Sequence, residues 1–337
     1  MGKIKLIAET AWHHDGDFAF MERLVNEILN KSKLDVIKMH LTLDFDEYIH
    51  PSHSIYDGFK TKLFSKKQWS TLFSDVHKSK KELMLLYNDT KAIEFGEKFD
   101  PQYVEIHSAC LNDIYLLDTL KNNISSNTRI VFGIGGSTLY EIENAINRIQ
   151  HDNLILMFGF QNFPTRYEDI NFKKMQRIMN LFPEFSFGYA DHTAWDEPNN
   201  ILITIMGVAL GVDYVEKHVT NVYGEKRVDW NSAVSIEMFN EISKKLKILN
   251  KCRGNGLIKL NEGEEKYSLY GPMKKAAVLK VAVKKGDILA NDKIEFKRTG
   301  ETTDLSQIEV INRFGYVILE DLRVGDLLFS RHLKKEK

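Results

Sequence analysis

Residues 188–220 read GYADHTAWDEPNNILITIMGVALGVDYVEKHVT, and the pattern of this stretch decides the fold. It holds two strand-like runs, which contain His192 and His218 near their ends, and one apolar helix-like run between them. Parallel strands need a crossover connection of this kind, so we expect the two runs to be neighbouring parallel strands. The two imidazoles would then lie at the same rim of the sheet.

The same alternation fills the first 220 residues. Strand-like runs begin near residues 5, 35, 82, 103, 129, 154, 186 and 213, and amphipathic segments separate most of them. Eight βα units in succession predict an α/β fold of the closed (β/α)8 TIM-barrel type, because eight parallel strands close a barrel that side chains can fill. A doubly wound sheet is a less economical alternative. We assign residues 1–251 to the barrel.

The chain changes character after the barrel. Residues 252–272, CRGNGLIKLNEGEEKYSLYGP, contain several glycines and show little periodicity, which predicts a linker. Residues 273–337 contain two short strand-turn patterns, VAVKKGDILANDKIEFKR and LEDLRVGDLLFSRHL, and no long helical pattern. We therefore expect a small β-rich domain at this end.

Composition excludes several classes of function. The formal net charge is −1, so neither a nucleic-acid nor an anionic-membrane partner is expected. No segment has the roughly eighteen consecutive apolar residues that a membrane helix needs, and MGKIKLIAET leads directly into a strand-like run, so we expect a cytoplasmic protein. Cys110 and Cys252 are the only cysteines and lack zinc-site spacing, so no disulfide framework is expected.

The active site of a TIM barrel lies at the C-terminal ends of its strands. Polar residues at these ends are therefore site candidates, and they are too numerous to be explained by packing. They are Glu9, Lys38, His40, Glu105, His107, Ser108, Gln161, Asp191, His192, Glu216 and His218. We expect His107 and Ser108 to belong to the fourth strand, YVEIHSA.

His192 and His218 are the strongest pair in this set. The barrel would place them on adjacent strands, and imidazole is a common ligand of divalent transition metals. Two protein ligands leave coordination positions for water or substrate, which favours a Lewis-acid site over a closed structural one. Asp229, just beyond the last strand, either orients a ligand, binds substrate hydroxyls, or is an ordinary exposed loop residue.

Two features could bind an anion. Lys38 could hold a carboxylate or phosphate at the rim, although an interior ion pair with Glu9 would look the same in sequence. The stretch VFGIGGST follows the fifth strand and contains Gly133, Gly135 and Gly136. It forms either a phosphate-binding nest of backbone amides at the start of a helix or a tightly packed turn.

Several stretches together resemble the N-acetylneuraminate (sialic acid) synthases and their relatives that make legionaminic and pseudaminic acid. IAETAWHHDGD is similar to the family's Ala-Glu-x-Gly-x-Asn-His-x-Gly-Asp opening, and NFPTRYEDINFKKM to its Tyr-Pro-Thr-Pro-Tyr-Glu-Asp-Val-Asn-Leu stretch. GYADHT and ALGVDYVEKHVT resemble its Gly-x-Ser-Asp-His-Thr and Ala-Leu-Gly-Ala-x-x-x-Glu-Lys-His-Phe-Thr motifs. The C-terminal domain resembles the antifreeze-like (SAF, β-clip) domain, with IEFKRTGE where the family has Arg-Pro-Gly-x-Gly.

The resemblance implies an enzyme that condenses phosphoenolpyruvate with the open-chain aldehyde of an N-acetylhexosamine. Phosphate is released and a nine-carbon 2-keto-3-deoxy acid, a nonulosonic acid, is formed. It also implies a divalent metal on His192 and His218 that polarises the aldehyde oxygen, with Mn²⁺ the first expectation and Co²⁺ or Zn²⁺ the alternatives. The catalytic residues implied are Glu9, His192 and His218.

A further set of positions matches the family's substrate side or belongs to the same strand ends. The residues that we expect to bind substrate are Lys38, His40, Ser108, Gln161, Glu216, Asp229 and Arg298. Arg298 matches an arginine that the small domain of one subunit places over its partner's barrel. The resemblance therefore implies a domain-swapped homodimer.

The departures from the family pattern gather where phosphoenolpyruvate would bind. EIHSAC replaces Lys-Ile-Gly-Ser-Gly-Glu, which puts Glu105 at the position of a phosphate-binding lysine and Cys110 at that of a glutamate. Gly133 and Ala190 replace serines. His40 and Gln161 replace a glutamine and an asparagine. A carboxylate beside a phosphate weakens binding that a lysine would strengthen.

These departures leave two other functions open. One is an enzyme on the same scaffold with a different donor, such as a pyruvate-type aldolase or lyase. The other is a non-catalytic sugar-binding homologue, although the retained His192, His218, Glu9 and Arg298 count against it. If phosphoenolpyruvate is the donor, Glu105 has to be paired, and a neighbouring histidine is one candidate partner.

Overall fold

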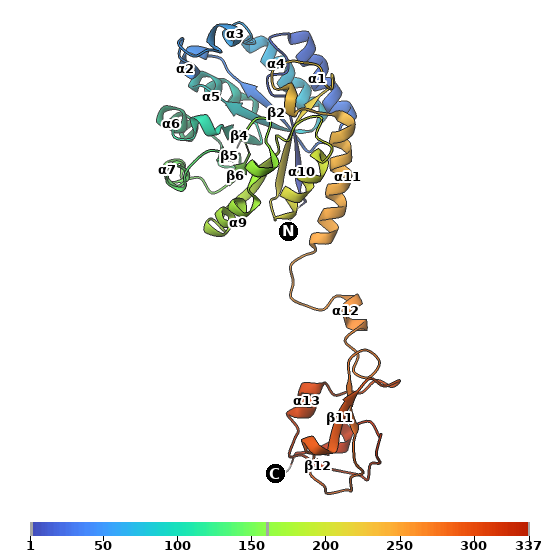
Figure 1. Ribbon diagram of the computed structural model, residues 1–337. Helices are drawn as coiled ribbons and strands as arrows, with labels where there is room; N and C mark the ends of the chain where they lie inside the picture. Colours follow the sequence, from blue (N-terminus) through green and yellow to red (C-terminus); the bar gives the residue numbers. More distant parts are fainter. Residues whose placement is uncertain (1–2, 160–161, 336–337) are drawn as a thin grey trace. The chain divides into compact units, whose positions relative to one another are not determined.

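The computed structural model describes residues 3–159 and 162–335 (Figure 1). The chain divides into two compact units, Met1–Asn255 and Gly256–Lys337. Helix α11 (Ile236–Arg253) ends the larger unit, and a short helix, α12 (Glu262–Lys266), forms inside the stretch 252–272 that the sequence marks as a linker. An Asn261 capping box with Glu264 explains why a helical turn forms there.

The larger unit is a closed barrel of eight parallel strands. These are β1 (Lys5–Glu9), β2 (Val36–Leu41), β3 (Glu82–Tyr87), β4 (Tyr103–Ile106), β5 (Arg129–Gly133), β6 (Leu154–Phe158), β7 (Ser186–Ala190) and β8 (Tyr214–Thr220). Each strand pairs with the next along the chain, and β1 also pairs with β8, which closes the sheet. The predicted TIM barrel is confirmed, and the doubly wound alternative is wrong. A short strand, β9 (Val234–Ser235), extends the pairing of β8.

Helices surround the strands (Figure 1). The longer ones besides α11 are α1 (Phe18–Lys31), α4 (Lys66–Ser79), α5 (Thr90–Gly96), α6 (Ile114–Asn123), α7 (Leu139–Ile149), α9 (Phe172–Leu181) and α10 (Asn200–Ala209). Short helices α2 (Phe45–Tyr48), α3 (Tyr56–Lys60) and α8 (Tyr167–Ile170) lie in the loops. The sequence pattern does not single out α5 and α6, which begin at aspartate caps, Asp89 and Asp113.

Strand four is shorter than the sequence suggests. It ends at Ile106, and residues Ser108–Cys110 form a single 3₁₀ turn. The reason is local, because the His107 ring accepts a hydrogen bond from the Ala109 amide through Nδ1 at 3.2 Å. His107 and Ser108 therefore lie just beyond the strand, in the loop at its C-terminal end.

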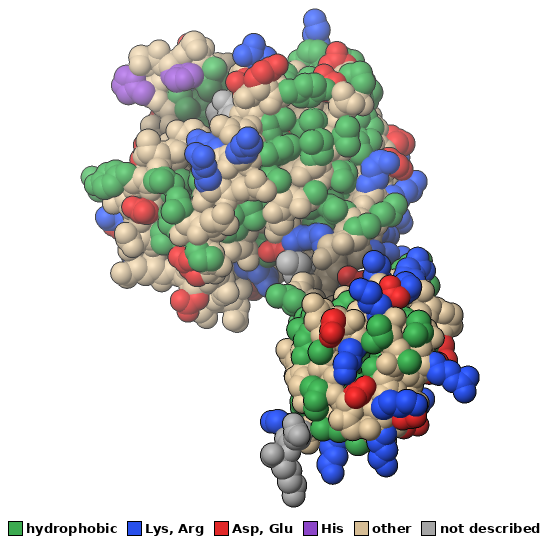
Figure 2. All heavy atoms as spheres, turned by 60° about the horizontal axis from the view of Figure 1, so that its bottom comes forward, with side chains coloured by type: hydrophobic (Ala, Val, Ile, Leu, Met, Phe, Trp, Pro, Cys, Tyr) green, Lys and Arg blue, Asp and Glu red, His purple; other side chains and the backbone are tan. Residues whose placement is uncertain are grey.

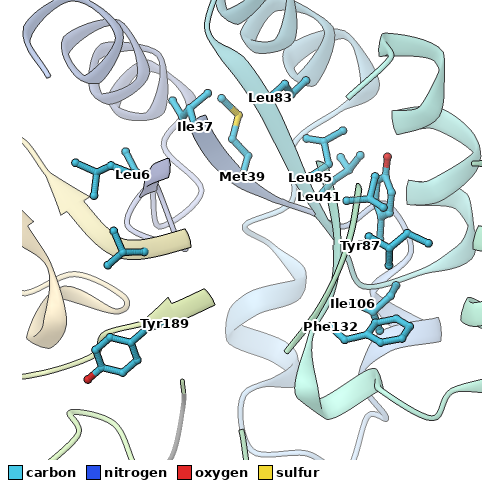
Figure 3. Packing of buried hydrophobic residues seen from close by; sticks show 14 of the residues in the cluster. Leu6, Ile37, Met39, Leu41, Leu83, Leu85, Tyr87, Ile106, Phe132 and Tyr189 are labelled. Carbon is cyan, nitrogen blue, oxygen red and sulfur yellow. The ribbon is translucent and has the colours of Figure 1, made fainter. Parts of the chain in front are cut away.

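The core has an outer and an inner layer because side chains alternate along each strand. The outer layer packs between the sheet and the helices, and Figure 3 shows part of it, with Ile37 and Met39 of β2 beside Leu83 and Leu85 of β3. A separate buried cluster fills the barrel interior. It consists of Ile7, Val36, Met84, Tyr103, Val131, Ile155, Met157, Ala190 and Tyr214.

Beyond α12, the described part of the smaller unit is built from two short antiparallel pairs and one short α-helix. β10 (Ala276–Leu279) pairs with β11 (Ile294–Lys297), and β12 (Val317–Ile318) pairs with β13 (Leu333–Lys334). Helix α13 (Gln307–Ile311) packs Val310 into a core of its own, which includes Leu279 and Leu328. A hydrophobic core of its own is what makes this unit compact without the barrel.

Figure 2 shows basic and acidic side chains interspersed with apolar ones over the face drawn. Within residues 3–159 and 162–335, no helix is both long and apolar enough to cross a bilayer.

Candidate active site

A cavity of about 640 Å³, which includes space open to solvent, lies at the C-terminal ends of the barrel strands. Eight of the ten residues assigned to catalysis or substrate binding from the sequence line it. They are Glu9, Lys38, His40, Ser108, His192, Glu216, His218 and Asp229. Of the other two, Gln161 lies outside the described residues, and Arg298 belongs to the smaller unit.

Three buried side chains at this rim could hold a metal ion. The candidate ligand atoms of Glu9, His192 and His218 all lie within 4.8 Å of one another. The two imidazole rings are nearly perpendicular, with centroids 4.9 Å apart. Two nitrogen donors and one carboxylate oxygen suit a divalent transition metal and leave positions open for substrate. The residues present therefore fit the metal that the resemblance implies.

Glu9 is a candidate metal ligand that the sequence analysis did not identify as one. It lies opposite His218 in the register of β1 and β8, the pair that closes the barrel. Its Oε2 is 3.2 Å from Nε2 of His218, and its Oε1 contacts Nε2 of His40. Residues 9 and 218 become neighbours only because the barrel closes between β1 and β8. Their spacing along the chain therefore does not indicate this contact.

The pKa values of the two histidines are shifted in opposite directions. Burial lowers the pKa of His192 to about 3, so this imidazole is neutral at pH 7. Burial acts in the same direction on His218, but the adjacent Glu9 carboxylate outweighs it and raises the pKa of His218. Because a metal binds the neutral imidazole, binding would displace any proton that His218 shares with Glu9.

A buried ion pair joins β7 and β8 beside the histidines. Lys217 Nζ lies 3.1 Å from Asp191 Oδ2, and both side chains are fully buried. The Asp191 carboxylate also accepts hydrogen bonds from the Thr193 amide at 2.9 Å and from the Thr204 hydroxyl of α10 at 2.5 Å. Side chains alternate along a strand, so Lys217 faces the helix layer while His218 faces the interior.

Lys38 lies at the centre of a ring of carboxylates. Its Nζ is 2.7 Å from Glu105 Oε2, 3.0 Å from Glu216 Oε1 and 3.5 Å from Glu9 Oε1. Burial alone would lower the pKa of Lys38, but Glu105, Glu216 and Glu9 together raise it above its ordinary value. Of the two roles that the sequence left open for Lys38, the structure shows the interior ion pair, enlarged by two further carboxylates. Glu105 is thus paired with Lys38 and not with a histidine.

The three carboxyl groups differ in their affinity for protons. Burial raises the pKa of Glu216 well above its ordinary value, and it raises the pKa of Glu105 as well. Burial acts on Glu9 in the same direction, but Lys38 and His218 outweigh it and hold the pKa of Glu9 well below its ordinary value. Glu9 is therefore ionised at neutral pH, the form that binds a cation.

Gly133 permits a close approach on the donor side of the cavity. A Cβ atom at this position would lie 3.0 Å from the Ser108 backbone nitrogen and 3.6 Å from Glu105 Oε1. The absent side chain thus leaves room for the loop after β4. The glutamate and the glycine that depart from the family pattern are thus neighbours in the cavity lining.

The start of α7 is capped by the chain itself. The Glu141 carboxylate accepts a hydrogen bond from the Thr138 amide at 2.7 Å, and the Glu141 amide donates to the Thr138 hydroxyl at 3.3 Å. This is a capping box, in which the Thr138 hydroxyl and the Glu141 carboxylate each accept a hydrogen bond from a terminal amide of the helix. The stretch VFGIGGST therefore leads into a helix start that already has a carboxylate bound to it.

Other residues complete the cavity wall. The Phe163 ring has its centroid 5.7 Å from that of His192 and 5.9 Å from that of His218. It belongs to the stretch NFPTRYEDINFKKM, but the sequence analysis did not single it out as a site residue. Asp229 lies across the rim, where Oδ2 accepts a hydrogen bond from the Trp12 amide at 3.1 Å. Asp229 is half-buried, so it is not an ordinary exposed loop residue.

Arg298 is exposed on the smaller unit. Its guanidinium donates two hydrogen bonds to the Pro272 carbonyl, at 2.8 Å from Nε and 2.5 Å from Nη2. These bonds orient the side chain at the edge of this unit, and substrate binding by Arg298 stays a prediction.

Comparison with known proteins identifies the family. Residues 35–257, well over half of the chain, match the NeuB family. The chain belongs to the NeuB family. The N,N'-diacetyllegionaminic acid synthase of Campylobacter jejuni is 26% identical to this NeuB-family chain over 318 residues, which cover 88% of the chain and 91% of that protein. The chain is accordingly an enzyme of the sialic acid synthase type.

Two solved structures share the fold. The putative spore coat polysaccharide biosynthesis protein E of Chromobacterium violaceum aligns with a TM-score of 0.80 at 17% identity, over 98% of this NeuB-family chain and 100% of that one. The N-acetylneuraminic acid synthetase of Leptospira borgpetersenii aligns with a TM-score of 0.71 at 21% identity, over 79% and 90%. At these identities the likeness supports the barrel architecture alone.

Proposed function

We propose that this enzyme condenses phosphoenolpyruvate with the open-chain aldehyde of an N-acetylhexosamine to form a nonulosonic acid, with release of phosphate. The observation that carries the proposal is the buried Glu9, His192 and His218 cluster at the mouth of the barrel. The name of the Campylobacter jejuni relative supports the class of product.

A divalent cation, with Mn²⁺ our first choice, would be held by Glu9, His192 and His218 and would act as a Lewis acid on the aldehyde oxygen. Glu9 is ionised and held by Lys38 and His40, so it can bind a cation or accept a proton but cannot act as an acid. Asp229, on the other side of the cavity, would orient the sugar hydroxyls.

The reaction forms one carbon–carbon bond and breaks one carbon–oxygen bond. The methylene carbon of the enol attacks the aldehyde carbon, and the aldehyde oxygen takes up a proton. Water then adds to the oxocarbenium carbon, and the bond from that carbon to the phosphate oxygen breaks. The buried Lys38, Glu105 and Glu216 form the floor of the cavity where these charges develop, and Ser108 lines its wall.

A second candidate is an aldolase or lyase that uses a pyruvate-type donor. It is favoured by Glu105, a carboxylate that lines the cavity where the family pattern has a lysine. A donor without a phosphate would bring less negative charge to this carboxylate.

Phosphate release distinguishes the two candidates. With Mn²⁺, phosphoenolpyruvate and a panel of N-acetylhexosamines, at least one sugar should give phosphate and a 2-keto-3-deoxy acid in equal amounts. Each sugar is also assayed with pyruvate, and phosphoenolpyruvate is assayed without sugar. A keto acid formed from pyruvate, with no phosphate released from phosphoenolpyruvate, would reject the synthase assignment in favour of the second candidate.

We also propose that residues 273–337 form an antifreeze-like (SAF, β-clip) domain that follows the linker 252–272 and the catalytic domain 1–251. Its two short antiparallel pairs and its separate core support this assignment. In a domain-swapped homodimer, Arg298 of one subunit would complement the anionic substrate bound in the partner's barrel.

Mixed dimers test this arrangement. His192→Ala subunits lack a barrel ligand, and Arg298→Ala subunits lack the proposed cap, so each homodimer should be inactive. After unfolding and refolding together, mixed dimers should recover about one quarter of wild-type activity, because about half of the dimers are mixed and each has one intact site. Mixed dimers that form but stay inactive would show that the cap does not act between subunits.

A further inference from the structure

The charges that face the cavity are mostly negative. Among the described residues that line it, carboxylates come from Glu9, Glu105, Glu216 and Asp229, whereas Lys38 is the one lysine or arginine. The side chain of Lys38 lies within 3.5 Å of three of these carboxylates. Its charge is therefore already balanced by the chain.

The histidines do not reverse this balance. Burial lowers the pKa of His107 to about 4, so this imidazole is neutral at pH 7. His40 and His218 each contact the Glu9 carboxylate. Among the described residues that line the cavity, four carboxyl groups therefore face one lysine.

Two amides at the start of α7 are also engaged. Those of Thr138 and Glu141, at the start of α7, are bonded within the capping box, and the Glu141 carboxylate adds a negative charge there. A helix start that binds a phosphate in other proteins does so with unpaired amides and a positive local potential. Here a carboxylate of the same chain already occupies this place.

We propose that Glu105 makes donor binding depend on the divalent cation, so that phosphoenolpyruvate binds only after the cation is in place. This inference rests on the proposed function. Phosphoenolpyruvate carries both a carboxylate and a phosphate, and the metal-free cavity repels both. A cation on Glu9, His192 and His218 would add two positive charges to a cavity where, among the described residues, four carboxyl groups face one lysine. A lysine in place of Glu105 would attract the donor without the metal.

Calorimetry of phosphoenolpyruvate against metal-free and Mn²⁺-loaded protein tests the dependence directly. Metal is removed with a chelator and gel filtration, and the data are corrected for association of Mn²⁺ with phosphoenolpyruvate in solution. We expect Mn²⁺ to lower the Kd of phosphoenolpyruvate by about 30-fold or more, within the usual range of coupling between sites. Because coupling is reciprocal, phosphoenolpyruvate should lower the Kd of Mn²⁺ by the same factor.

Glu105→Gln assigns the dependence to one side chain. The amide keeps the size of the carboxylate and removes its charge, so metal-free protein should now bind phosphoenolpyruvate and the coupling should fall to about threefold or less. Glu82→Gln is the matched control. Glu82 also pairs with a lysine, Lys5 at 2.6 Å, but it begins β3 at the opposite end of the barrel, so its loss should leave the coupling unchanged.

The outcomes separate this inference from the proposed function. Equal affinity of wild type with and without Mn²⁺ would overturn the inference while phosphoenolpyruvate remained the donor. Strong coupling that Glu105→Gln leaves unchanged would also overturn it, because another group would then be responsible. Failure of wild type to bind phosphoenolpyruvate under either condition would instead remove the donor from the proposed function, and the inference with it.

Discussion

Replacement of His192 or His218 by alanine should abolish divalent-metal binding and lower synthase activity by more than about 100-fold, because loss of groups that merely support metal ligands already costs about 10–100-fold. Each variant leaves one imidazole and the Glu9 carboxylate of the three candidate ligands. Two protein ligands make a weak site that dialysis should empty.

Elemental analysis of dialysed protein measures the effect without any assay of activity. Wild type should hold about one metal ion per barrel after equilibration with Mn²⁺, as a three-ligand site predicts. His50→Ala removes an imidazole from an exposed loop and should change nothing. If both buried-histidine variants, folded by circular dichroism, kept their full metal content, the assignment of the site would be wrong.

Lys217→Met should lower the free energy of unfolding by about 3–5 kcal/mol, the usual cost of leaving one buried charge without its partner. Lys217 and Asp191 are both fully buried, so water cannot replace the lost contact. Urea unfolding of metal-free protein measures the loss. Lys31→Met is the control, since its ion pair with Glu27 is exposed and its removal should cost less than about 1 kcal/mol.

The double variant Asp191→Asn/Lys217→Met separates stability from geometry. With both charges removed, no buried charge is left unpaired, so much of the stability should return. The Kd of Mn²⁺ should nevertheless stay weakened by about tenfold or more, as for other groups that orient metal ligands. A double variant with restored stability and wild-type metal affinity would show that the pair stabilises the barrel without positioning His192 and His218.

The barrel and its histidine pair could be predicted because both depend on local pattern. The spacing of apolar residues within each run identifies it as a strand or a helix. The C-terminal ends of the parallel strands must then meet at one rim of the barrel. His192 and His218 follow directly from this rule, because one βα unit separates them. The prediction needed no knowledge of contacts across the barrel.

Contacts across the barrel could not be predicted in the same way. A closed barrel places β1 beside β8, but the pairing of Glu9 with His218 depends on the register of these two strands. The ring of Glu9, Glu105 and Glu216 around Lys38 likewise joins three strands to a fourth. Sequence identifies each of these residues as polar and at a strand end. It does not say which of them form ion pairs with one another, and so the partner of Glu105 was left open.

The close approach of Gly133 to the loop after β4 restricts mutational paths on the donor side. Gly133→Ser alone would place a Cβ atom 3.0 Å from a backbone nitrogen, that of Ser108, which cannot rotate away as a side chain can. Glu105→Lys alone leaves the backbone unchanged and sets two amines against the carboxylates of Glu9 and Glu216. Because the Ser108 nitrogen belongs to the backbone, a change at residue 105 alone does not relieve this contact, and a path toward the family pattern must also shift the loop after β4.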